Sequence, residues 1–164
     1  MSGRAFVFGD DVDTDVLAPG RYMKGPIEEL AQHCLEAIAP EFAGDVRPGD
    51  VVVAGRNFGM GSSREQAAQA LKVLGVEAVI ARSFGGIFYR NALNLGLPVV
   101  VCAETDAIHA GDRLRIDLAA GTVANETSDR ILQSEPLPQF LLDMLADGGL
   151  VPHLEKKFAR EKLR

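Results

Sequence analysis

The middle third of the chain alternates short apolar runs with helical patterns, and this alternation constrains the fold more than any other feature. Continuous apolar runs, typical of buried parallel strands, cover Val51–Ala54, Ala78–Ala81 and Leu97–Cys102. The segments between them, Ser63–Leu74 and Ile87–Leu95, have helical periodicity, and a glycine follows each where a left-handed residue ends a helix. Short links between strand and helix require right-handed crossovers and a parallel sheet. The sequence therefore predicts an α/β fold with a parallel βαβαβ core.

Shorter elements are predicted on both sides of this core. Ala5–Phe8 is typical of an opening or edge strand, and the apolar spacing from Pro26 to about Ile38 predicts a helix. After the core, alternating apolar and charged residues predict a smaller antiparallel section, made of the N-terminal strand and strands within Arg113–Ile131. A helix is predicted at Gln139–Ala146. The charged tail from about Glu155 to Arg164 is interpreted as a solvated, helix-prone face.

Length and composition are those of an ordinary globular domain. The 164 residues are 47% hydrophobic and 24% charged, and we interpret 1–164 as a single domain. The net charge of −6 argues against nucleic acid as a partner, because a phosphate-binding face needs a basic excess. No stretch approaches the roughly 20 apolar residues of a membrane span, and no signal peptide is evident. We expect a soluble, cytoplasmic protein without membrane contact.

The cysteines and histidines do not predict a metal site. Cys34 and Cys102 are far apart and lack the spacing of metal ligands, and their apolar neighbours indicate core thiols. His33, His109 and His153 have no mutual metal spacing either. We therefore expect no metal on this chain.

The segment Gly55–Glu65, between the first core strand and its helix, carries the polar residues that best suit a binding site. Its glycines let the backbone approach a ligand closely, and a helix start offers unpaired N–H groups at the positive end of the dipole. Arg64 stands at this helix start, where a cation is unfavourable unless an anion binds there too. The competing interpretation is simple capping, with Ser62 and Glu65 as a capping box or the same template one residue later. The pattern leaves both open.

Three common motifs do not fit this segment. The dinucleotide pattern needs a third glycine where Arg64 stands, and a P-loop needs a Gly-Lys pair that is absent. A nucleophile elbow needs a glycine two residues after its serine, and none is there. The sequence therefore does not indicate any of these three kinds of site.

Several separated motifs occur along the chain: Asp11–Asp15 near the N-terminus, Gly59–Glu65, and Ala81–Phe84 followed by Ile87–Ala92. Together they resemble the swivelling domain of the aconitase superfamily. Their order, their spacing and the chain length are similar to those of the stand-alone small subunits of isopropylmalate isomerase and homoaconitase. The resemblance covers about residues 5–155. It implies the family's swivelling β/β/α domain.

The resemblance also implies an activity and a set of site residues. Enzymes of the family are hydro-lyases that dehydrate a 2-hydroxy di- or tricarboxylate and rehydrate it at the neighbouring carbon. Carried over by position, Ser62 resembles the catalytic serine base, and Ser63 and Arg64 resemble ligands of a substrate carboxylate. Asp15 matches an acidic position of the opening motif, where we expect a supporting catalytic role; an Asp that caps the loop is the alternative.

The cofactor that the resemblance implies does not fit this chain. The family's [4Fe–4S] cluster is held by three cysteines, and two scattered cysteines cannot supply them. We therefore expect the cluster on a large partner subunit, with this chain closing over it. The sequence leaves open whether the isolated chain forms a homo-oligomer.

The loop Tyr22-Met23-Lys24-Gly25 resembles the family segment that selects the substrate. Isopropylmalate enzymes place apolar residues there, and homoaconitases place an Arg that matches an extra carboxylate. Lys24 suits a carboxylate better than an isopropyl group, although its flexible side chain can also turn toward solvent. Isopropylmalate, with a role in leucine biosynthesis, is the first expectation for the substrate, and homoaconitate and methylmalate-type acids are the alternatives.

Two interpretations from other classes stay open. A regulatory α/β module could sense a carboxylate or phosphate through the same loop without catalysing a reaction. A structural assembly subunit could keep the motif residues for packing alone. Only the enzyme needs Ser62 as a base, so substitution of Ser62 separates the three.

Overall fold

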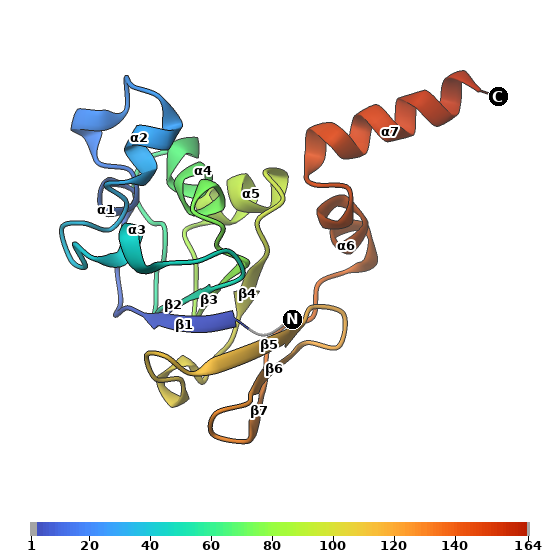
Figure 1. The fold of residues 1–164 in the computed structure, drawn as a ribbon. Helices are drawn as coiled ribbons and strands as arrows, with labels where there is room; N and C mark the ends of the chain where they lie inside the picture. Colours follow the sequence, from blue (N-terminus) through green and yellow to red (C-terminus); the bar gives the residue numbers. More distant parts are fainter. Residues whose placement is uncertain (1–2, 164) are drawn as a thin grey trace.

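A computed structural model describes residues 3–163, in which seven strands form one mixed sheet (Figure 1). Their spatial order is β4-β3-β2-β1-β5-β6-β7. The strands are β1 Gly3–Val7, β2 Val51–Val53, β3 Ala78–Ala81, β4 Val99–Val101, β5 Arg113–Asp117, β6 Thr122–Asn125 and β7 Arg130–Gln133. Strands β1 to β4 are parallel to one another, and β5 to β7 are antiparallel. The predicted α/β fold, with a parallel core and a smaller antiparallel section, is confirmed.

The N-terminal strand joins the two parts of the sheet. β1 pairs in parallel with β2 on one side and antiparallel with β5 on the other. The prediction of an edge strand is wrong for this reason, although β1 does open the sheet. Its two hydrogen-bonding edges make it the point where strand direction changes.

The helices lie mainly in the connections of the parallel part. They are α1 Thr14–Leu17, α2 Ile27–Ala31, α3 Phe42–Asp45, α4 Glu65–Val73, α5 Gly86–Asn94, α6 Gln139–Ala146 and α7 Leu150–Lys162, with 3-10 turns η1 Gly20–Tyr22 and η2 Thr105–Ala107. Gly75 and Gly96 follow α4 and α5 with φ of +88° and +83°, as the helix-ending pattern predicted. The bounds of α6 agree with the prediction.

The helix predicted from Pro26 to about Ile38 is wrong in its second half. α2 ends at Ala31, and turns occupy the segment up to residue 38. Leu35 has a φ of +64°, and its N–H donates to Val16 O at 3.0 Å instead of continuing the helix. The apolar spacing of this segment is buried, but the chain buries it through turns that reach the segment around Val16.

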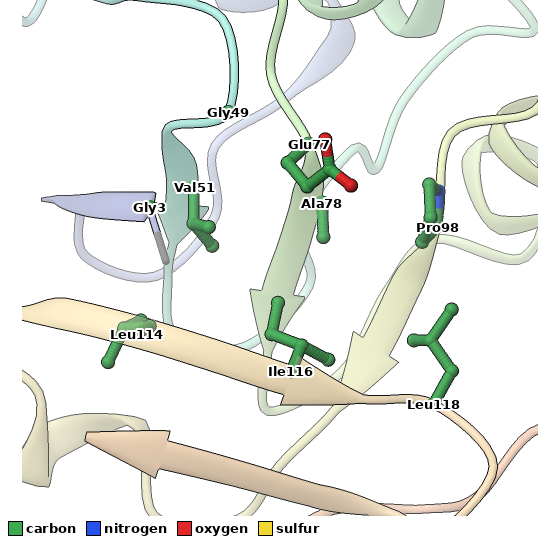
Figure 2. Close-up of a pocket in the computed structure, with 9 residues that line it drawn as sticks. All are labelled: Gly3, Gly49, Val51, Glu77, Ala78, Pro98, Leu114, Ile116 and Leu118. Atoms are coloured by element: carbon green, nitrogen blue, oxygen red, sulfur yellow. The ribbon is translucent and has the colours of Figure 1, made fainter. Parts of the chain in front are cut away.

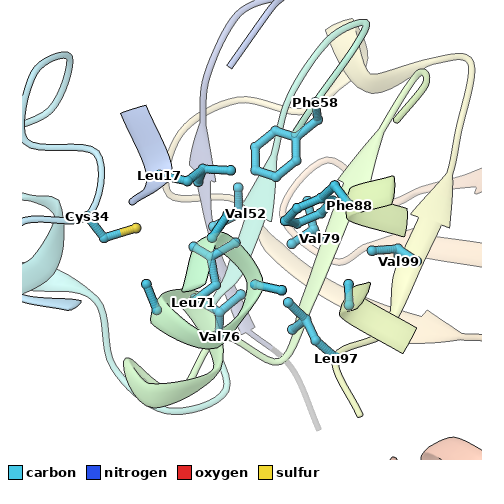
Figure 3. Close-up of a cluster of buried hydrophobic side chains, with 14 of the residues drawn as sticks. Leu17, Cys34, Val52, Phe58, Leu71, Val76, Val79, Phe88, Leu97 and Val99 are labelled. Atoms are coloured by element: carbon cyan, nitrogen blue, oxygen red, sulfur yellow. The ribbon is translucent and has the colours of Figure 1, made fainter. Parts of the chain in front are cut away.

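Two apolar clusters on opposite faces of the parallel strands show the layers of the fold. Along β2, Val52 belongs to the first cluster, whereas Val51 and Val53 belong to the second, because successive side chains of a strand point to opposite faces. Side chains of α4 and α5 cover the first face (Figure 3). Leu114, Val123 and Leu132, from β5 to β7, cover the second. The result is the expected β/β/α arrangement.

A shallow cavity lies where the two parts of the sheet meet, at the amino ends of the parallel strands (Figure 2). Its volume is about 170 Å³, and Ile116 and Leu118 point into it from the antiparallel side. The residues that line it are Gly3, Gly49, Val51, Glu77, Ala78, Pro98, Leu114, Ile116 and Leu118. None of the predicted site residues is among them.

The C-terminal helix extends away from the body of the molecule (Figure 1). α7 has no buried residue, which agrees with the predicted solvated, helical tail up to residue 163. Asp147 fixes its first turns by accepting from His153 Nδ1 at 2.7 Å and from Lys156 Nζ at 3.0 Å. Within residues 3–163, each helix is too short or too polar to cross a bilayer.

Candidate active site

The segment after β2 is held against the segment after β1 by backbone hydrogen bonds. The N–H groups of Asp11, Gly59 and Thr14 donate to Arg56 O at 2.8 Å, Val12 O at 2.7 Å and Met60 O at 2.9 Å, respectively. Both segments leave the carboxyl ends of parallel strands, the edge at which open α/β sheets bind ligands. The two motifs at 11–15 and 59–65 therefore meet in space.

Two glycines make this close approach possible. Gly59 and Gly61 have φ of +77° and +116°, a region that side chains disfavour. A Cβ on Gly59 would lie 2.2 Å from the Phe88 ring, and one on Gly61 would lie 2.9 Å from Thr14 Oγ1. Both positions therefore require glycine, for backbone conformation and for space.

The start of α4 differs from the predicted capping box. The helix begins at Glu65 with Arg64 at the N-cap, and no side chain accepts a hydrogen bond from its first N–H groups. Neither Ser62 nor Ser63 caps the helix, so both variants of the capping interpretation are wrong. A helix start without a side-chain cap leaves backbone donors free for an anion.

Arg64 connects the helix start with the opening motif. Its guanidinium forms an ion pair with Asp15 and donates from Nη1 to Ala18 O at 3.1 Å. Its side chain is 25% exposed, whereas that of Asp15 is 69% exposed. The structure therefore brings Asp15 and Arg64 together, with the arginine held on one side and reachable on the other.

Ser62 lies beside the same motif. Its Oγ is 3.3 Å from Thr14 Oγ1, and either hydroxyl can donate. Thr14 is buried, whereas Ser62 and Ser63 are exposed. The sequence did not single out Thr14 by itself; the signal was its place inside the Asp-Thr-Asp motif.

The loop from Tyr22 to Gly25 lies next to this group. A Cβ on Gly20, two residues before the loop, would lie 4.0 Å from Arg64 Nη2. Tyr22 and Met23 are half-buried, whereas Lys24 and Gly25 are exposed. Lys24 forms no ion pair with another described residue, so its charge is available.

The structure also places the cysteines and one histidine that the sequence had treated as structural. Cys34 and Cys102 are both buried, on opposite faces of the sheet, and burial raises the pKa of each thiol above its ordinary value. His33 stacks on Tyr22, with ring centroids 3.6 Å apart and planes 2° apart. Among residues 3–163, no three His, Cys, Asp or Glu side chains are grouped as metal ligands.

Comparison with known proteins identifies the family to which the chain belongs. The aconitase C-terminal domain matches residues 39–104. The 3-isopropylmalate dehydratase small subunit 2 of Archaeoglobus fulgidus is 52% identical over 158 residues, which is 95% of each chain. The chain belongs to the 3-isopropylmalate dehydratase and homoaconitase small-subunit family of the aconitase superfamily.

Other relatives of this small subunit support the same family assignment. The methanogen homoaconitase small subunit of Methanothermobacter thermautotrophicus is 53% identical over 157 residues, 95% of this chain and 91% of the relative. A crystal structure of 3-isopropylmalate dehydratase from Methanocaldococcus jannaschii superposes with a TM-score of 0.93 at 45% identity, covering 99% of this chain and 98% of that one. The small subunit is thus part of a hydro-lyase, as the resemblance implied.

Proposed function

We propose that this small subunit completes the active site of a heteromeric hydro-lyase by binding a substrate carboxylate and supplying a serine base. The observation that carries the proposal is the start of α4, where Arg64 occupies the N-cap and no side chain accepts from the first N–H groups. Ser62 and Ser63 are exposed immediately before it. Donors, a cation and hydroxyl groups thus converge at one helix end.

The α4 start suits a carboxylate for electrostatic reasons. The unpaired N–H groups carry partial positive charge, and the dipole of this nine-residue helix adds to it. Arg64 can donate two parallel hydrogen bonds to one carboxylate, which fixes both position and orientation. Ser63 offers one further hydroxyl donor. Asp15 supports this arrangement by holding Arg64 in place.

Ser62 is the group that we assign to proton transfer. A serine alkoxide is a strong base, but it forms at ordinary pH only if its negative charge is stabilised. The α4 dipole, the Arg64 cation and a hydrogen bond from Thr14 Oγ1, which lies 3.3 Å away, all favour that charge. Ser62 would take the proton from the substrate carbon next to the one that bears the hydroxyl group.

The iron–sulfur chemistry is assigned to the partner and not to this chain. The two thiols lie on opposite faces of the sheet, buried, and burial disfavours the thiolate that iron binds. The names of the relatives as small subunits support a large partner subunit, and we place the cluster on that partner.

For the substrate we propose 3-isopropylmalate first, because the relatives quoted from Archaeoglobus and Methanocaldococcus are named for it. One observation favours homoaconitate as the second candidate. Lys24 is exposed, lies in the loop beside Arg64, and forms no ion pair with the other residues described. An extra substrate carboxylate would pair with it, whereas an isopropyl group would gain nothing from its charge.

The test is an anaerobic hydration and dehydration assay with a large subunit whose iron–sulfur cluster has been reconstituted. The substrates are isopropylmalate, homoaconitate, and citramalate or another methylated malate. We expect turnover only when both chains are present, and a loss of about 10³-fold in Ser62→Ala with substrate binding retained. Absence of turnover in a formed complex with an intact cluster would overturn the catalytic role.

The same assay separates the enzyme from the alternatives. A regulatory module would bind the acids equally well in the wild type and in Ser62→Ala, without turnover in either. An assembly subunit would support turnover that neither Ser62→Ala nor Arg64→Lys changes. Each result assigns the motif to a different role.

A further inference from the structure

The Tyr22–Gly25 loop contacts His33, a residue outside the motifs that carry the family resemblance. Tyr22 lies parallel to the His33 ring, with centroids 3.6 Å apart and planes 2° apart. The guanidinium of Arg21 lies over the Tyr22 ring, 5.4 Å from its centroid. The tyrosine of this loop therefore contacts both a cation and an imidazole ring.

The position of the His33 ring is itself fixed. Its Nδ1 lies 2.6 Å from Glu36 Oε2, a hydrogen bond between side chains three residues apart. The neighbouring Cys34 is fully buried in the first apolar cluster and anchors the backbone. Two residues after His33, the Leu35 N–H donates to Val16 O at 3.0 Å. This turn thus contacts both the substrate loop and the residue after Asp15.

The position of Tyr22 in turn determines the position of the residues after it. Gly25 N–H donates to Tyr22 O at 3.2 Å, and Met23 N–H donates to Gly20 O at 3.3 Å. The first bond closes a tight turn around Met23 and Lys24, and the second closes the preceding turn around Arg21 and Tyr22. Because Tyr22 belongs to both turns, a shift of Tyr22 would also move the Lys24 backbone.

We propose that His33, oriented by Glu36, is a positioning residue that sets the substrate selectivity of the Tyr22–Gly25 loop. The assignment rests on the proposed function, because it takes this loop as the part that meets the variable group of the substrate. The early end of α2 makes the contact possible. A helix continued to Ile38 would remove the turn that places His33 against Tyr22 and Leu35 against Val16.

The first arm of the test needs no partner and no substrate. Arg21 and Lys24 are exposed trypsin sites on either side of the held residues. We expect cleavage after them to be about fivefold faster in His33→Ala, because an aromatic stack is lost. His33→Phe keeps a flat ring and should stay within about twofold of the wild type, and Glu36→Gln should lie between the two. His109→Ala, which removes an exposed imidazole elsewhere, should have no effect.

The second arm uses the assembled enzyme. In His33→Ala we expect KM to rise about fivefold with kcat changed less than about twofold, because the loop is mispositioned while Ser62 is not. The ratio of kcat/KM for isopropylmalate to that for homoaconitate should move toward one, and His33→Phe should restore it. A merely structural role would lower the amount of folded enzyme without changing this ratio.

The outcomes separate the two proposals. If the wild-type complex turns over no acid, the proposed function fails, and the trypsin arm still decides whether His33 holds the loop. If cleavage in His33→Ala equals that of the wild type, or if cleavage changes while KM and the substrate ratio do not, the positioning role is overturned. A melting temperature for each variant ensures that faster cleavage is compared between folded proteins.

Discussion

Polar residues at two places in the sheet differ in how far the fold itself satisfies them. At the carboxyl ends of the parallel strands, Ser62 and Lys24 are exposed, and Arg64 is held on one side only. Beside β5, the Asp112 carboxylate accepts from Asn125 Nδ2 at 2.8 Å and from the His109 N–H at 2.8 Å, and both Asp112 and Asn125 are buried. The first group of residues remains available to a ligand, whereas Asp112 and Asn125 are used in the structure itself.

The electrostatics of Asp112 agree with a structural role. The His109 backbone N–H, and then the Asn125 side chain, hold the pKa of this carboxyl below its ordinary value. Donors that converge on a carboxylate stabilise its charged form, and that stabilisation is part of the folding free energy. The number of hydrogen bonds alone therefore does not mark a functional group. A functional group must also have a donor or acceptor that a ligand can reach.

Substitution of Ser62 should have the largest effect, and that effect should be on catalysis. Ser62→Ala should lower kcat of the assembled enzyme by about 10³-fold, because it removes the proposed base. Its melting temperature should stay within about 1 °C of the wild type, because the side chain is exposed. Steady-state kinetics and calorimetry measure the two quantities. A variant that loses stability and activity together would place Ser62 among structural residues, like Asp112.

The second effect concerns the backbone that carries the site. Gly59→Ala should destabilise the fold by about 3 kcal/mol, because it forces a side chain into a positive φ and against the Phe88 ring. Gly86→Ala is the matched control, since a Cβ there meets nothing within 4 Å and its φ is ordinary. Urea unfolding of both variants tests this. Equal stability of the two would show that the loop is not packed against α5 as described.

The parallel core could be predicted from sequence because its signals are local and repeated. Apolar runs of strand length, helical spacing and a glycine after each helix all agree there, so Val51, Ala78 and Gly75 lie where the pattern indicated. The position of β1 in the middle of the sheet was not predictable in this way. Its pairing with β5 joins residues more than 100 positions apart, and the residues of Gly3–Val7 do not indicate which strand will be their partner.

The residues of the candidate site were predicted from their identity, and their geometry was not. The motif resemblance singled out Asp15, Ser62 and Arg64; the structure pairs Arg64 with Asp15 and places Ser62 beside the neighbouring Thr14. Helix capping by Ser62, the competing interpretation, does not occur, because the same serine pattern serves a cap or an open loop depending on where the helix starts. The contact of His33 with Tyr22 was missed because it depends on the early end of α2, which tertiary packing decides.

Removal of the Asp112 carboxylate should affect stability and not catalysis. Asp112→Ala should lower the free energy of unfolding by about 2 kcal/mol, because it leaves the buried amide of Asn125 and the His109 N–H without an acceptor. The kcat of the folded, assembled enzyme should not change. Asp106→Ala, at an exposed position, is the control and should be close to neutral. A selective loss of kcat in Asp112→Ala would contradict the difference between the two groups of residues.

The smallest effect concerns Asp147, a half-buried carboxylate outside the candidate site. His153, and then Lys156, hold the pKa of Asp147 below its ordinary value, and the carboxylate links α6 to α7. Since the folded pKa is the lower one, its stabilisation is present above the unfolded value of about 4 and is lost as the pH falls through the folded pKa. Hydrogen exchange at the start of α7, corrected for intrinsic rates, should therefore increase about twofold in acid.

Asp147→Asn should show that faster exchange already at neutral pH and little further change in acid, with turnover unaffected. If exchange at the start of α7 is the same in both proteins at every pH, the ion pair does not hold α7, and Asp147 becomes a free surface carboxylate.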